Sequence, residues 1–264
     1  MVLRLLKGFA PIAALGAALL AAGCDANITI NGDEGVPLSE LRTAGETPTQ
    51  IVLAGPDSVV VERGEALKIE TSGDPAAVAA LRFSLKNDTL AISRAKGEVE
   101  GDGTARVAVT LPMLEKIVVA GSGTLEAPGL ADQAEVTIAG SGTAVTRAID
   151  AQSLAVTVAG SGTYRASGRT PKLDLTIAGS GTADMSGLHA DAAEVTVAGS
   201  GNARFASDGT VEAVVMGSGD VTVAGRAKCT IKSMGSGSLR CAAGTPAAGA
   251  SDPPASGTPS APRE

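Results

Sequence analysis

The chain has 264 residues, 28 of them acidic and 21 basic, with 34 glycines, one tyrosine and no tryptophan. So few large rings exclude a globule packed around aromatic side chains and predict a thin aliphatic core. The acidic balance argues against nucleic acid or an anionic lipid surface as the binding partner.

The first 23 residues have the pattern of an export signal. Arg4 and Lys7 precede an apolar run that is too short to cross a membrane comfortably. The Leu-Ala-Ala-Gly-Cys sequence that ends at Cys24 resembles a bacterial lipobox. This pattern predicts a signal peptide over residues 1–23 and a lipid on Cys24 that attaches the protein to an envelope membrane in the periplasm. An ordinary signal peptide with an incidental cysteine is the alternative. Asp25 resembles an inner-membrane retention signal of enteric bacteria, so the inner membrane is favoured and the outer membrane stays open.

The segments on either side of the expected domain are poor in large side chains. Residues 24–48 mix Gly, Pro, Thr and Glu with no sustained apolar period, which predicts a flexible linker between the lipid and the domain. Residues 242–264 are mostly Ala, Gly, Ser and Pro, which predicts a disordered tail. The folded domain is therefore expected over residues 49–241.

Repeats dominate this domain. Gly-Ser-Gly begins at seven places separated by 18 to 20 residues: Gly121, Gly140, Gly160, Gly179, Gly199, Gly217 and Gly235. On both sides of each tripeptide, apolar or small residues alternate with other residues, as in a strand with one buried face. The places expected to point inward before the tripeptides are Ala134, Val136, Ile138, Leu154, Val156, Val158, Leu173, Leu175, Ile177, Ala193, Val195 and Val197. Those expected inward after the tripeptides are Leu125, Ala127, Ala144, Thr146, Tyr164, Ala166, Ala183, Met185, Ala203, Phe205, Val221 and Val223.

A coil of 18–20 residues with two short strands buries its inward face only by stacking on its neighbours. The sequence therefore predicts an all-β fold, a right-handed parallel β-helix (a β-solenoid) that turns at Gly-Ser-Gly. The flanking glycines permit positive φ and close stacking, and the central serines are expected to form a structural ladder along one edge. The ladder consists of Ser122, Ser141, Ser161, Ser180, Ser200, Ser218 and Ser236. Residues 51–115 lack the tripeptide but contain strand-like apolar runs, which we interpret as less regular early coils that cap the solenoid.

Several segments occur in a characteristic order. Residues 49–55 and a Val-rich strand are followed by Leu-Ala-Ile-Ser at 90–93, Val-Thr-Leu-Pro at 109–112 and Ile-Val-Val-Ala-Gly-Ser-Gly at 117–123, before the further Gly-Ser-Gly turns. In this order the chain resembles the head GIN domain family of auto-transporter adhesins over residues 48–241. The resemblance implies a β-helix fold and a role in adhesion, and it supplies no catalytic residues.

Two cysteines lie at equal distances from Gly235, the first residue of the last tripeptide. Cys229 lies six residues before Gly235 and Cys241 lies six residues after it, so both are expected on inward places of the last coil. In an oxidising compartment this spacing predicts a disulfide that holds the last coil in place. Two buried free thiols are the alternative.

The remaining candidates for chemistry are acidic residues and one histidine. Asp174, Glu194 and Glu212 precede successive tripeptides by five residues and are expected to stack as an outward acidic ladder. The ladder is a weak candidate for calcium, but we expect no metal site, because solvated side chains splay apart and the sequence has no calcium-loop motif. His189 is expected in a solvated loop that closes a coil, rather than as a catalytic base.

No residue set in the sequence names a reaction or a ligand. We therefore expect a non-enzymatic, lipid-anchored envelope protein that presents a long β-face for binding or adhesion, without a cofactor. Its expected partners are the membrane, through the N-terminal lipid, and an unidentified protein or glycan, but no nucleic acid. One alternative is a polysaccharide-active β-helix enzyme, which requires a cleft of converging charged side chains. Another is an envelope scaffold or stress protein that self-associates through the ends of the solenoid.

Overall fold

The computed structural model describes residues 35–95 and 103–243. The expected signal peptide, the lipid-attachment residue Cys24, the first part of the linker and residues 244–264 of the tail lie outside the described residues. Among the described residues, no helix has the length and apolar character needed to span a membrane.

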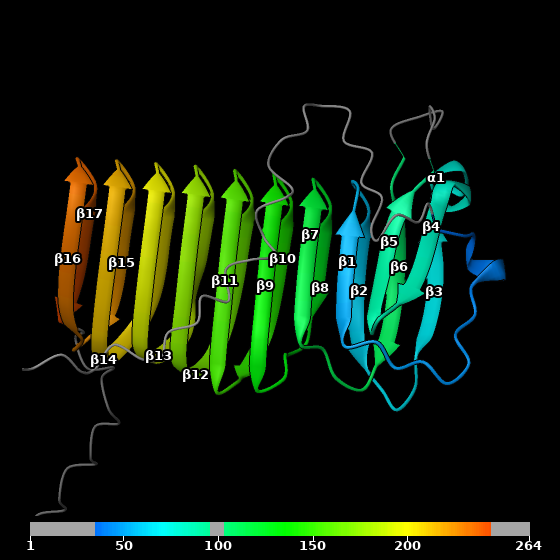
Figure 1. Cartoon of the computed structure of the whole chain (residues 1–264), viewed down its shortest axis with the longest axis horizontal. Helices are drawn as coiled ribbons and strands as arrows, with labels where there is room; N and C mark the ends of the chain where they lie inside the picture. The colour runs from blue at the N-terminus through cyan, green and yellow to red at the C-terminus, as the bar shows by residue number, and fades with distance from the viewer. Residues whose placement is uncertain (1–34, 96–102, 244–264) are drawn as a thin grey trace, which may run out of the picture. The chain divides into compact units, whose positions relative to one another are not determined.

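The domain is a β-solenoid of about seven turns with parallel stacked coils, as the sequence predicted (Figure 1). Each regular coil has one strand before a Gly-Ser-Gly corner and one after it. The strands of the regular coils are β7 (Lys116–Gly121), β8 (Thr124–Ala127), β9 (Gln133–Gly140), β10 (Thr143–Asp150), β11 (Ser153–Gly160), β12 (Thr163–Gly179), β13 (Thr182–Gly199), β14 (Asn202–Gly217), β15 (Asp220–Gly225), β16 (Lys228–Gly235) and β17 (Ser238–Ala243).

Stacking creates two parallel faces that enclose the core. The pre-corner sheet contains β7, β9, β11, the second halves of β12, β13 and β14, and then β16. The post-corner sheet contains β8, β10, the first halves of β12, β13 and β14, and then β15 and β17. Because β12, β13 and β14 each run through the bend opposite the corner, they belong to both sheets.

The period-two pattern places side chains as expected. The residues predicted to point inward in the coils before the last one are buried, including Tyr164, Phe205 and Val195. In the last coil, Cys229 is half-buried and Cys241 is exposed. Alternating apolar residues form strands here because each strand gains hydrogen bonds from both neighbours while its apolar face leaves water. The prediction of the inward face is therefore confirmed for the coils before the last one.

The corner requires both of its glycines, for different reasons. Gly160 has a φ of +113°, and a Cβ there would lie 2.5 Å from the carbonyl oxygen of Gly140 in the preceding coil. Gly162 would place a Cβ 2.5 Å from the side chain of Ile138. The first glycine thus supplies a backbone conformation that L-residues avoid, and the second allows close approach to the core.

The N-terminal region is built differently from the early coils that we expected. Its elements are η1 (Leu38–Glu40), β1 (Gln50–Ala54), β2 (Ser58–Arg63), β3 (Lys68–Gly73), α1 (Pro75–Ala80), β4 (Leu81–Lys86), β5 (Thr89–Arg94) and β6 (Ala105–Leu111). The β1–β2 coil lies between β5–β6 and β7–β8, so stacking order departs from chain order. Strands β4 and β3 then pair antiparallel with β5 and β6 and end the stack.

Local sequence explains the reversals in this cap. Asn87 and Asp88 have φ values of 49° and 59° and connect β4 to β5 as a tight hairpin. Asp74 accepts a hydrogen bond from the N–H of Ala77, and Pro75 follows it directly, so α1 begins with two favourable residues.

A buried ion pair connects the cap to the first corner. Asp57 occupies the place of the second corner glycine in the β1–β2 coil and is 1% exposed. Arg94 donates to its two carboxylate oxygens from Nε at 2.8 Å and from Nη2 at 2.6 Å. Ala105 donates a third hydrogen bond through its backbone N–H, at 2.8 Å. The carboxylate therefore joins the β1–β2 corner to both strands of the neighbouring coil.

Part of the expected flexible linker packs against this cap. Val36 exchanges two backbone hydrogen bonds of 2.8 Å with Phe83 in β4. Leu38 and Leu41 are partly buried against the core. The sequence pattern did not reveal this contact because the apolar residues of this short segment follow neither a helical nor a strand period.

The opposite end of the solenoid has no covering strand among the described residues. Cys229 and Cys241 are joined by a disulfide, and their Cα atoms are 6.6 Å apart. Ile231, which lies on the inward side of β16, is 40% exposed, and the outward Met234 is 66% exposed. The disulfide links β16 to β17 in the coil that receives packing from one side only.

Candidate binding groove on the post-corner sheet

The corner serines line up along one edge, and all seven are exposed. The hydrogen bonds between successive corners run through the backbone: the N–H of Ser161, for example, donates to the carbonyl oxygen of Gly140 at 2.9 Å. Within the described chain, no hydrogen bond joins one corner serine hydroxyl to another. The ladder is thus a row of solvent-facing hydroxyls on a backbone-bonded edge.

The three acids of the expected ladder occupy one row of the pre-corner sheet. Asp174 lies opposite Glu194, which lies opposite Glu212, and all three are exposed. Nearer the N-terminus, Glu135 in the same row forms an ion pair of 2.8 Å with Lys116. The described residues contain no group of three or more His, Cys, Asp and Glu side chains arranged to hold a metal ion. The geometry therefore gives the calcium hypothesis no support.

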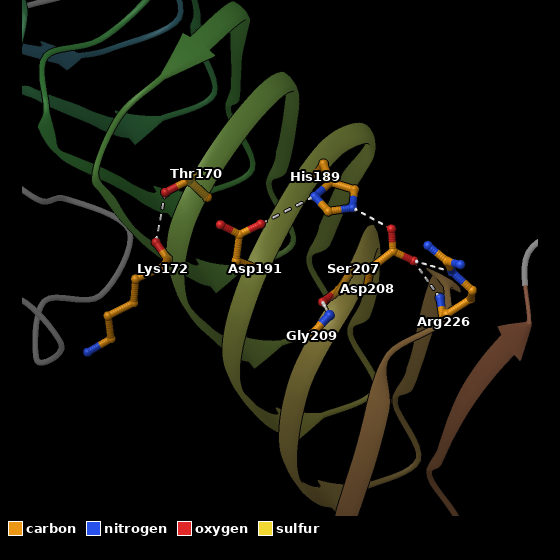
Figure 2. A network of polar contacts seen from close by, with 8 residues as sticks. All are labelled: Thr170, Lys172, His189, Asp191, Ser207, Asp208, Gly209 and Arg226. Carbon is orange, nitrogen blue, oxygen red and sulfur yellow. Dashed lines mark hydrogen bonds and ion pairs between the residues drawn. The ribbon is translucent and has the colours of Figure 1, made fainter.

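His189 lies in strand β13 rather than in the loop that we expected, and Figure 2 shows it within a polar network across three coils. Its Nε2 lies 3.3 Å from Oδ2 of Asp208, and its Nδ1 lies 3.8 Å from Oδ1 of Asp191. The backbone N–H of Arg226 donates to Oδ1 of Asp208 at 2.8 Å. This hydrogen bond, followed by that from His189, lowers the pKa of Asp208. The prediction of a solvated loop histidine is corrected: the side chain is 34% exposed and connects neighbouring coils.

Buried hydroxyls stabilise the bends next to this network (Figure 2). Thr170 and Ser207 are fully buried. Thr170 donates to the carbonyl oxygen of Lys172 at 2.9 Å, and Ser207 accepts from the N–H of Gly209 at 3.2 Å. These bonds satisfy polar groups where the strand ladder is interrupted by register shifts. The network is thus best explained as part of the bend.

A groove of about 310 Å³ opens on the outward side of the post-corner sheet. Strands β10, β12 and β13 contribute its wall, because Val145 lies opposite Arg165 and Arg165 lies opposite Asp184. The register shifts after Thr146 and Arg165 turn the strands away and leave space above small residues. The complete lining is Val145, Thr146, Arg147, Arg165, Ala166, Ser167, Asp184, Ser186 and Gly187.

The polar groups of the groove are partly engaged with one another. Arg147 forms an ion pair of 2.7 Å with Glu126, and its carbonyl oxygen accepts a hydrogen bond from the Ser167 hydroxyl. The Ser186 hydroxyl donates to Oδ1 of Asp184. That hydrogen bond lowers the pKa of Asp184, and the positive charges of nearby arginines lower it further. Asp184 is therefore a carboxylate at neutral pH.

The floor of the groove rests on a buried polar pair. Tyr164 is fully buried, and its hydroxyl lies 3.1 Å from Oγ1 of Thr146. Burial raises the pKa of the Tyr164 hydroxyl, so it stays protonated and serves as a hydrogen-bonding group. The pair fixes Thr146 under the outward residues and gives the groove a rigid base.

Sequence reasoning identified none of the groove residues as a site. Aligning the repeats does place Glu126, Val145, Arg165, Asp184, Arg204, Thr222 and Arg240 at one outward place, three residues after each tripeptide. This row of positive and negative side chains was a signal in the sequence that could have indicated a binding surface on the outward face. The groove itself depends on where the strands shift register, which the alignment does not encode.

The comparisons with known proteins agree with the fold. The profile of a family described as "Putative auto-transporter adhesin, head GIN domain" matches residues 47–227. No curated protein matches the chain.

Three solved structures illustrate the similarity. A putative adhesin from Bacteroides fragilis NCTC 9343 has a TM-score of 0.71 and 21% identity, covering 75% of this chain and 93% of its own. A putative lipid binding protein from Parabacteroides distasonis ATCC 8503 has a TM-score of 0.58 and 20% identity, with the same coverage. A putative adhesin from Parabacteroides merdae ATCC 43184 has a TM-score of 0.59 and 16% identity, covering 75% and 92%. At these identities the likeness establishes the fold.

Proposed function

Because the chain belongs to the head GIN domain family of auto-transporter adhesins, we propose that it is a lipid-anchored, non-catalytic protein of the bacterial cell envelope that binds its ligand through the solenoid surface. The observation that carries this proposal is the in-register stacking of outward side chains on β8, β10, β12, β13 and β14. A rigid array of this kind offers repeated contacts to an extended ligand at little cost in conformational entropy.

Binding is favoured over polysaccharide cleavage by the composition of the groove. Hydrolysis of a glycosidic bond ordinarily uses two carboxyl groups, one of which is protonated to act as an acid. Asp184 is the only carboxylate among the residues that line the groove, and its pKa is lowered rather than raised. The groove thus supplies charge and hydrogen bonds for holding a ligand, without the acid that hydrolysis needs.

Self-association through the end of the solenoid is less favoured. The last coil carries Lys228, Lys232 and Arg240 as exposed residues. Positive charges on an edge strand repel a second copy of the same edge and are a common protection against pairing. We expect the mass of the protein in light scattering to be independent of concentration; a dimer that forms as concentration rises would favour the scaffold alternative.

Lipid attachment is tested by labelling cells with radioactive palmitate. The wild-type chain should incorporate the label and fractionate with membranes, whereas Cys24→Ser should incorporate none and be released from them. Cys241→Ser serves as the control for loss of a cysteine elsewhere and should keep the label. Palmitate on the Cys24→Ser protein contradicts lipid attachment at this residue.

Ligand binding is tested with the full chain solubilised in detergent, on a glycan array and in a pull-down from envelope extracts. Each assay is run with calcium and with a chelator, since the acidic ladder was the candidate for calcium. A specific hit that chelation leaves unchanged supports metal-independent binding. If neither assay gives a hit, the binding function is wrong.

A further inference from the structure

We propose that the groove on the post-corner sheet binds an acidic saccharide, with its anionic group held by Arg165 and its hydroxyls held by Asp184 and the groove serines. This inference rests on the proposed binding function and names the ligand class for it.

The groove is a site of positive charge on an acidic protein. The chain has a net charge of −7, but guanidinium groups outnumber carboxylates around the groove. The lining contains two guanidinium groups, those of Arg147 and Arg165, and one carboxylate, that of Asp184. An anion that approaches this surface therefore meets local attraction despite the overall charge.

Arg165 is the cation available to a ligand. It is exposed at the wall of the groove, and within the described chain it forms no ion pair. Its neighbours in the row are Val145 on one side and Asp184 on the other. The charge of Arg165 acts on Asp184 across the strand pair, but no hydrogen bond joins the two side chains in the described part of the chain. The N–H donors of Arg165 therefore remain for a carboxylate, sulfate or phosphate group.

The hydroxyls of the groove select a ligand that also carries donors. The Ser167 hydroxyl donates its hydrogen to the carbonyl oxygen of Arg147, and the Ser186 hydroxyl donates its hydrogen to Asp184. Both serine oxygens consequently present lone pairs to the groove, and Asp184 adds its second oxygen. Sugar hydroxyls supply the matching donors. A simple anion such as phosphate alone leaves these acceptors unused.

The dimensions limit how much of the ligand enters. The volume of about 310 Å³ lies at the low end of the ~300–1,000 Å³ typical of ligand sites, which suits one sugar ring with its acidic substituent. Gly187 keeps the floor low, since a Cβ there would lie 2.9 Å from the Cβ of Ser167. The lining has no aromatic ring on which a sugar could stack, so the affinity depends on charge and falls as salt rises.

The test uses the detergent-solubilised full chain and isothermal titration with three probes: an oligogalacturonate, a neutral galacto-oligosaccharide of the same length, and vesicles of phosphatidylglycerol. We expect the oligogalacturonate to bind, and Arg165→Met to weaken this binding by about tenfold or more, because the variant lacks the charge-assisted contact to the anionic group. Asp184→Asn should weaken it less. Arg240→Met, at the same place of the repeat in the last coil, is the matched control and should change the Kd less than about twofold.

The outcomes separate this inference from the proposed function. Equal binding of the acidic and neutral oligosaccharides, or acidic binding that neither Arg165→Met nor Asp184→Asn changes, overturns the inference. So does binding of the vesicles alone, which assigns the surface to anionic lipid. If the array finds a ligand that is insensitive to both variants, the binding function stands and only the groove assignment fails. Thermal melting of each variant verifies that these exposed substitutions leave the fold intact.

Discussion

Removing the carboxylate of Asp57 is expected to loosen the N-terminal cap. The side chain is 1% exposed and accepts three hydrogen bonds, two from Arg94 and one from the backbone of Ala105. In Asp57→Ala the guanidinium of Arg94, whose side chain is 16% exposed, loses its carboxylate partner and keeps a hydrogen bond to the carbonyl oxygen of Gly103. An unpaired, largely buried charge destabilises a protein by ~3–5 kcal/mol. For a domain of this size the corresponding drop in melting temperature is roughly 6–20 °C.

The position of the pair predicts where the loss appears. Arg94 ends β5 and Ala105 begins β6, so amide hydrogen exchange should accelerate in these strands before it does so in β12 or β13. Circular dichroism measures the melting temperature, and exchange followed by mass spectrometry locates the opened strands.

Two further variants separate charge from packing. Asp57→Asn keeps the size of the side chain and an acceptor for Ala105, so its loss should be smaller than that of Asp57→Ala. The double variant Asp57→Ala/Arg94→Met removes both charges and should recover part of the stability, because no buried charge remains unpaired. A melting temperature of Asp57→Ala within about 2 °C of wild type would refute the reasoning.

Three other substitutions test the solenoid. Val195→Asp places a charge in the thin core, where the native side chain is 2% exposed, and should cost ~4 kcal/mol or more in urea unfolding; unchanged stability would show the inward assignment to be wrong. In Gly160→Ala the new Cβ would lie 2.5 Å from the carbonyl oxygen of Gly140, at a residue whose φ is +113°, so the free energy of unfolding should fall by ~1–3 kcal/mol. Ser161→Ala, at the neighbouring exposed residue, should change it by no more than ~0.5 kcal/mol. The pKa of Asp208 is lowered from 3.8, so the stability that its ionised form contributes is complete above that value and is lost as the pH falls through the lowered pKa. Asp208→Asn should therefore flatten the acid side of a plot of melting temperature against pH, and an unchanged plot would exclude this contribution.

The sequence by itself determined the coil and its faces. A tripeptide that returns every 18–20 residues fixes the coil length, and alternation over a few residues fixes which side chains point inward, as the burial of Val195 and Tyr164 confirms. Both are local properties, because a strand's faces depend on a period of two and a corner depends on three adjacent residues. The same periodicity brought Cys229 and Cys241 to facing strands of one coil.

Only the tertiary structure decided how the coils of the N-terminal region stack on one another and on the first regular coil. The β1–β2 coil inserts between β5–β6 and β7–β8, and this insertion brings Asp57 to Arg94 across 37 residues of sequence. The groove likewise depends on register shifts after Thr146 and Arg165, which set where three strands turn away from one another. Which strands pair and where bulges form depends on the free energy of the whole stack, because each strand forms its hydrogen bonds and buries its apolar face together with its neighbours.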